Sequence, residues 1–91
     1  MTESGTLIAM LQSAQIRAAR AMLGWRQEDL AKAAKTGLAT IARIEQQEGP
    51  AQGHVSTMIR IQEALERAGV HFLENEGEGY GVRLTIKPRR R

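Results

Sequence analysis

The 91-residue chain has no cysteine and few aromatic residues, and both absences narrow the kind of protein it can be. Without cysteine it has no disulfide framework and no thiolate metal site, and we expect a reducing, cytoplasmic setting. Aromatic residues make up 3% of the chain (Trp25, Phe72 and Tyr80), so the core must be aliphatic. No apolar run approaches the ~20 residues of a membrane span, and the first residues lack the positive charge of a signal peptide. We therefore expect one small domain with no membrane partner.

Residue combinations that support catalysis or bind metal are missing as well. The sequence offers no carboxylate pair, no nucleophile beside a base and no cluster of metal ligands, so we do not expect an enzyme. His54 and His71 have no companions at ligand spacing, which favours ordinary surface histidines over a metal site. The glycines of residues 77–81 stand among acids and precede no helix, which argues against a phosphate cradle. No cofactor is expected.

Charged residues are present and unevenly distributed. The formal net charge is +3. Basic residues crowd the first half of the chain and its last five positions, whereas acidic residues concentrate between positions 63 and 78. This asymmetry predicts a basic face suited to a polyanion and a different, more acidic face.

Between residues 13 and 69 the apolar residues recur at helical spacing. Ser13 is the expected N-cap of a first helix that ends at about Leu23, before Gly24. Three further helices are expected over residues 27–34, 38–46 and 55–68, with a Gly-Pro loop before the last. The expected inward side chains are Ile16, Ala19, Leu23, Leu30, Ala31, Ala34, Ile41, Ile44, Val55, Met58, Ile61 or Ile59, and Leu65.

The segment Gln27–Gln46 is the most informative part of the chain. It fits two short amphipathic helices joined by a tight turn at residues 35–37, and its inward alanines let the helices cross closely. Ala39, Thr40 and Arg43 remain on the outer side of the second helix. This is the pattern of a helix-turn-helix, whose second helix enters the DNA major groove.

After Gly69 the periodicity changes to that of strands. Residues 70–73 and 82–86 are β-like around a turn-rich segment, which predicts a β-hairpin. A two-stranded hairpin is only marginally stable alone, so it must pack on the helices or pair with another chain. We expect a homodimer interface that includes Val70, Phe72, Val82, Leu84 and Ile86. The chain then divides into an N-terminal extension (1–12), a helix-turn-helix domain (13–69), the hairpin (70–86) and a basic tail (87–91).

The stretches RAARAMLGWRQEDLAKAA, ATIARIEQ, EALERAGVHF and GVRL resemble the Cro- and phage-repressor-like (XRE-type) helix-turn-helix transcriptional regulators. The resemblance spans roughly residues 16–84. It implies a mainly α, compact four- to five-helix lambda-repressor-like DNA-binding domain with a C-terminal β-hairpin. It also implies a homodimer on double-stranded DNA, with a near-palindromic operator and recognition helices about one DNA turn, ~34 Å, apart.

The resemblance also implies roles for individual residues. The third helix would present four residues to base edges: Leu38, Ala39, Thr40 and Arg43. Arg43 can donate twice to guanine, and its alternative is a surface arginine paired with Glu48 or Gln47. Glu45 is expected to be structural, bonded to backbone or to an arginine. The expected phosphate contacts are Gln27, Arg26, Lys35, Thr36 and Gly37.

Four positions depart from the family pattern. Lys35 stands where glycine is common, Gly37 where a Ser or Thr cap is common, Leu38 where a polar or basic residue is frequent, and Arg26 where Ser or Thr is usual. These departures motivate one alternative function, an interaction module that no longer binds DNA. A second alternative is an antitoxin or other protein-neutralising module, with the acidic residues 74–78 facing a protein partner.

Overall fold

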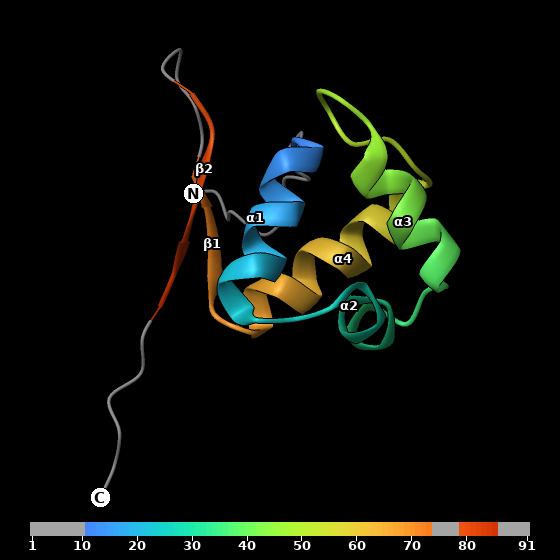
Figure 1. The fold of residues 1–91 in the computed structure, drawn as a ribbon, viewed down its shortest axis with the longest axis horizontal. Helices are drawn as coiled ribbons and strands as arrows, with labels where there is room; N and C mark the ends of the chain where they lie inside the picture. Colours follow the sequence, from blue (N-terminus) through green and yellow to red (C-terminus); the bar gives the residue numbers. More distant parts are fainter. Residues whose placement is uncertain (1–10, 74–78, 86–91) are drawn as a thin grey trace, which may run out of the picture.

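The computed structural model describes residues 11–73 and 79–85, which form four helices followed by a two-stranded antiparallel sheet (Figure 1). The elements are α1 (Ser13–Leu23), α2 (Gln27–Ala34), α3 (Leu38–Gln46), α4 (Val55–Arg67), β1 (Val70–Leu73) and β2 (Gly81–Leu84). The predicted mainly helical domain with a C-terminal hairpin is therefore confirmed. The basic tail, the acidic segment 74–78, Ile86 and most of the predicted N-terminal extension lie outside the described residues.

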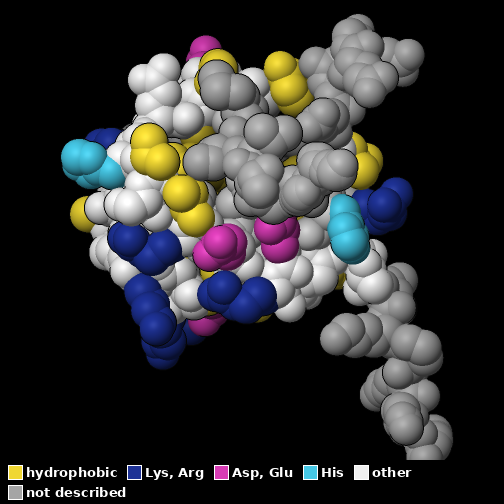
Figure 2. All heavy atoms as spheres, turned by 180° about the vertical axis from the view of Figure 1, so that it is seen from behind, with side chains coloured by type: hydrophobic (Ala, Val, Ile, Leu, Met, Phe, Trp, Pro, Cys, Tyr) yellow, Lys and Arg dark blue, Asp and Glu magenta, His cyan; other side chains and the backbone are white. Residues whose placement is uncertain are grey.

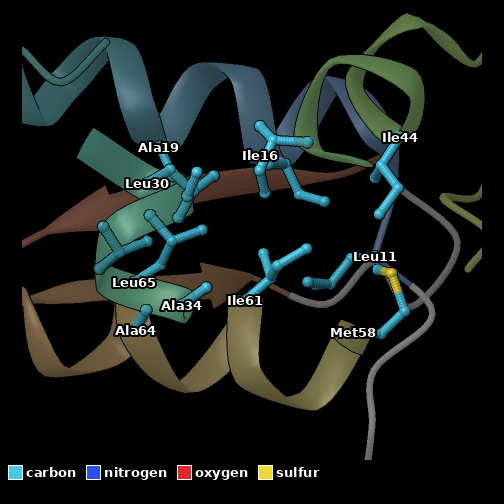
Figure 3. Packing of buried hydrophobic residues seen from close by; sticks show 13 residues of the cluster. Leu11, Ile16, Ala19, Leu30, Ala34, Ile44, Met58, Ile61, Ala64 and Leu65 are labelled. Carbon is cyan, nitrogen blue, oxygen red and sulfur yellow. The ribbon is translucent and has the colours of Figure 1, made fainter. Parts of the chain in front are cut away.

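The core is aliphatic, as the shortage of aromatic residues predicts. Its fully buried members include Ile16 of α1, Leu30 of α2, Ile41 and Ile44 of α3, and Leu65 of α4. Figure 3 shows the residues of α2 and α4 pointing toward one another, with alanines between the larger side chains. Burial of one such aliphatic side chain contributes about 1.5–3 kcal/mol, so this shared core fixes how the helices cross.

Two expected helix details are wrong. Ser13 is not the N-cap of α1 but its first residue; Gln12 takes the cap position. The Ser13 side chain is fully buried and its hydroxyl donates to the Ile44 carbonyl at 2.8 Å, because the α1 N-terminus abuts the end of α3. Val55 is 65% exposed rather than inward. As the first residue of α4 it points outward, while Met58 turns into the core.

The hairpin packs its apolar face on the helices of its own chain. Val70 pairs with Leu84 and Phe72 with Val82, and all four side chains lie against the helical core. Val70 is only 1% exposed, so its side chain is buried in the core of the protomer and is not available to a second chain. The four described members of the expected dimer interface thus have a role within the protomer.

Gln15 of α1 fixes the far end of the hairpin to the helices. Its side chain is buried, and its amide nitrogen donates to the Gly81 carbonyl at 2.9 Å. Its amide oxygen accepts from the backbone N–H of Gln12 at 2.8 Å. This one side chain therefore joins the start of α1 to the start of β2.

Candidate nucleic-acid interface

The turn between α2 and α3 keeps the geometry of a tight turn although lysine stands where glycine is common. Lys35 has φ +56°, and it is the one non-glycine with positive φ among residues 11–73 and 79–85. Its N–H donates to the Lys32 carbonyl at 3.2 Å, and the Thr36 N–H donates to the Ala31 carbonyl at 3.0 Å. These two bonds are those of a Schellman motif. Gly37 follows as the N-cap of α3, without a side-chain cap.

The outer face of α3 carries a stripe of uncommitted side chains. Ile41, Ile44 and Glu45 are buried, whereas Ala39 and Arg43 are exposed, and Thr40 and Ala42 are half-buried. Leu38, at the first position of the helix, is 44% exposed. The expected base-contacting residues therefore lie on or beside the open face of α3. Arg43 forms neither of the two ion pairs among the described residues, and no bond to Glu48 or Gln47 is present there.

Gln46 belongs to the same open face and is absent from the residues that sequence reasoning selected. It is exposed and follows Ala39 and Arg43 at helical spacing, i, i+4, i+7. The spacing alone would have identified it, since Ile41, Ile44 and Glu45 mark the opposite side of the helix.

One polar stripe of α1 holds the end of α3. Ser13, Arg17 and Arg20 follow one another at i, i+4, i+7 and so share a helix face. The Ser13 hydroxyl donates to the Ile44 carbonyl, and an Arg17 N–H donates to the Glu45 carbonyl. Carbonyls in the last turn of a helix lack the usual partner one turn ahead. The Gln47 N–H reaches the Ile44 carbonyl at 3.4 Å, and α1 supplies the side-chain donors to the Ile44 and Glu45 carbonyls.

A buried carboxylate joins α1, α2 and α3. Glu45 is 3% exposed; Arg20 Nε donates to its Oε2 at 2.8 Å and Arg20 Nη2 to its Oε1 at 2.9 Å. Arg20 also donates to the Trp25 carbonyl at 3.0 Å. The hydrogen bonds that Arg20 donates to the Glu45 carboxylate raise the pKa of the Arg20 guanidinium above its ordinary value. The expected structural role of Glu45 is thus observed, with Arg20 as its arginine.

Gln27 is the second residue that bonds this carboxylate. Its amide nitrogen donates to Glu45 Oε1 at 3.2 Å. An amide nitrogen carries two hydrogens, so one N–H of Gln27 remains for another acceptor. The structure therefore fixes the side chain that the resemblance assigns to a phosphate.

The other expected phosphate contacts lie at the two ends of α2. Arg26 is the N-cap, its side chain is 77% exposed, and it meets Asp29 only at 3.8 Å. Lys35, Thr36 and Gly37 form the turn at the opposite end, about 12 Å away along eight helical residues. The structure thus brings Arg26 beside Gln27, and brings the turn residues beside the start of α3.

The predicted separation of charges does not extend over the whole surface. On the face shown in Figure 2, basic and acidic side chains lie side by side. A shallow hollow between α2 and α4 is lined by Lys35, Arg60, Glu63 and Arg67. Arg60 Nε donates to the Ala34 carbonyl at 3.1 Å, so this cation stabilises the carboxyl end of α2.

Two other classes of site find no support in the part of the chain that the structure describes. None of its helices is long and apolar enough to cross a membrane. No group of three or more His, Asp or Glu residues there could hold a metal ion.

A comparison with protein-family models gives a match over residues 16–68, which is more than half of the chain. The matching family is Helix-turn-helix, of the XRE/Cro-like type. The chain therefore belongs to this family of DNA-binding domains, whose members are typically not enzymes. No curated protein matches the chain.

Proposed function

We propose that this protein is a sequence-specific transcription regulator, acting as a repressor or autoregulator on a near-palindromic operator. The observation that carries the proposal is the open face of α3. It presents a free arginine and small side chains on a helix whose other side is buried. Such a helix can lie in the major groove, where base edges differ in their donors and acceptors. This activity implies a cytoplasmic location.

In this proposal the contacts divide between bases and backbone. Arg43 reads guanine through a bidentate contact, while Leu38, Ala39 and Thr40 contact neighbouring base edges. Gln27 gives its second N–H to a phosphate, and Arg26, Lys35, Thr36 and Gly37 contact phosphates at the ends of α2. The fixed Gln27 side chain supports this division, because Glu45 already holds it in one orientation.

The departures from the family pattern do not argue against DNA binding. Lys35 adopts the left-handed conformation that the turn requires, and Gly37 occupies the N-cap position. Leu38 is exposed and available to a thymine methyl. These observations favour the regulator over a module that has lost its nucleic-acid partner.

Selection of bound duplexes from a random pool, repeated with two variants, tests the proposal. Arg43→Ala should relax the preference at one or two base positions, because a bidentate contact contributes about 1–3 kcal/mol of discrimination. Gln27→Ala should weaken binding to all sequences about equally, since a phosphate contact carries no sequence information. If both variants keep the wild-type motif and affinity, this docking of α3 is wrong.

A further inference from the structure

We infer that Gln46 is a base-reading residue, and that its carboxamide selects an adenine near the base pair read by Arg43. This inference rests on the proposed function, since it concerns how α3 reads DNA. It adds a specificity-determining residue at the carboxyl end of the helix, beyond the positions that the resemblance assigns.

The position of Gln46 on α3 is the first argument. Ala39, Ala42, Arg43 and Gln46 stand at i, i+3, i+4 and i+7, so they form one stripe opposite the buried residues of the helix. Arg43 and Gln46 are nearly one helical turn apart, so their side chains emerge next to each other on this exposed face. When α3 lies in the major groove and Arg43 reaches a base pair, Gln46 faces the adjoining part of the groove.

The shape of the stripe is the second argument. Its first two members, Ala39 and Ala42, end at a methyl group, whereas Arg43 and Gln46 are long. Small side chains let the helix backbone approach the groove, and the longer ones then extend to base edges. The major groove is ~12 Å wide and admits one helix, so a stripe of this kind suits it.

The rigidity of the backbone around Gln46 is the third argument. The carbonyls of Ile44 and Glu45 accept from Ser13 and Arg17 of α1. On the other side, Gln47 bonds Gln52 twice: its Nε2 donates to the Gln52 carbonyl at 3.0 Å, and its Oε1 accepts from the Gln52 N–H at 2.8 Å. Gln46 thus has a fixed backbone and an exposed side chain.

The side chain of Gln46 itself is unused within the part of the chain that the structure describes. It makes no hydrogen bond to another described residue. A carboxamide offers one donor and one acceptor side by side, which matches the adenine N7 and N6 pair in the major groove. Among the bases, adenine is therefore the expected partner.

The decisive experiment compares duplex selection for wild type, Gln46→Ala and Gln46→Glu. Gln46→Ala should lose an adenine preference at one position of the half-site, next to the guanine that depends on Arg43. Gln46→Glu should move that preference to cytosine, because a carboxylate accepts from cytosine N4 but cannot donate to adenine N7. Gln52→Ala is the matched control. It removes an exposed carboxamide from the loop after α3, keeps the backbone atoms that bond Gln47, and should leave the selected motif unchanged.

A chemical probe on the wild-type protein checks the same contact without a mutation. Replacing the selected adenine by 7-deaza-adenine removes only the N7 acceptor, and should weaken binding on the order of ten-fold. Gln46→Ala should be insensitive to this replacement.

The outcomes separate the two proposals. If wild type selects no motif, the proposed function and this inference both fail. If wild type selects a motif that Gln46→Ala leaves intact, or if Gln46→Ala weakens all sequences equally, Gln46 does not read a base. The regulator function then stands without it.

Discussion

Lys35 holds a left-handed backbone conformation in the turn that joins α2 to α3. For a side chain with a Cβ this conformation costs about 1 kcal/mol, and glycine avoids most of that cost. The two turn hydrogen bonds, from Lys35 and Thr36, form nevertheless. In the proposed complex, the cation of Lys35 lies near the DNA backbone and increases the affinity for DNA. Lysine at this position therefore lowers the stability of the fold but raises the affinity for DNA.

Lys35→Gly should raise the free energy of unfolding by about 1 kcal/mol relative to Lys35→Ala, since both remove the cation and only glycine relieves the strain. Urea denaturation with an unchanged m value measures the difference. Both variants should lose DNA affinity to a similar degree and show a salt dependence smaller by about one counterion. Equal stability of the glycine and alanine variants would show that the turn is not strained.

Among the elements, α1 acts as the support of α3. Ser13, Arg17 and Arg20 hold its last turn, and the Arg20–Glu45 pair adds a tie that reaches Gln27 of α2. Replacing one partner of a buried ion pair is costly, because the other charge stays buried and unpaired. The orientation of α3 therefore depends on residues that face away from its open side.

Arg20→Met should lower the free energy of unfolding by about 3 kcal/mol, because it leaves the Glu45 carboxylate buried without its main partner. The double variant Arg20→Met with Glu45→Leu should recover most of this loss. Denaturant unfolding of both single variants and the double variant gives the coupling energy. Arg26→Met is the control; it breaks the exposed 3.8 Å contact with Asp29 and should cost less than about 1 kcal/mol. A double variant as unstable as Arg20→Met would contradict this account.

The elements themselves were largely predictable. Periodicity predicts the four helices and the two strands, and Gly24 predicts the end of α1, because these signals depend on neighbours within a few residues. The predictions for Ser13 and Val55 are wrong for a shared reason. Whether a residue in the first turn of a helix is buried depends on what lies beside that turn, here the end of α3 for Ser13 and solvent for Val55.

In the molecule as a whole, α3 and the hairpin lie at opposite ends (Figure 1). This arrangement bears on the homodimer that the family resemblance implies, which we propose for the regulator. Two protomers could lie side by side, related by a two-fold axis parallel to the direction from the hairpin to α3. Both α3 helices would then lie on the same side of the dimer, separated by about the width of a protomer. The shorter extents of the molecule are 32 and 22 Å, of the same order as the ~34 Å of one DNA turn.

We propose that the dimer forms through the edges of the hairpin and through the end of the hairpin at which β1 stops and β2 begins. A two-stranded sheet has two unpaired edges. At that end of the hairpin, Leu73 and Tyr80 are 39% and 56% exposed. Val70, Phe72, Val82 and Leu84 would support this surface from below, since they pack on the helical core.

Light scattering after size exclusion should give a dimer for wild type and a smaller mass for Leu73→Glu, because a buried charge at the contact is costly. Val55→Glu introduces the same charge at an exposed aliphatic residue on α4 and should leave the dimer intact. A wild-type monomer at high protein concentration would remove the hairpin dimer from the proposal.

The order of residues alone specified the helices, the turn between α2 and α3, the hairpin and the aliphatic core, because each follows from the local spacing of apolar residues. It also indicated Arg43 as the outward cation of α3. The hydrogen-bond partners of the buried polar side chains depend on how the helices pack in the tertiary structure. Glu45 contacts Arg20 and Gln27, and Ser13 contacts Ile44, across 18 to 31 positions of chain. Such pairings arise when helices cross, and no local pattern fixes them; the same crossing leaves Gln46 free.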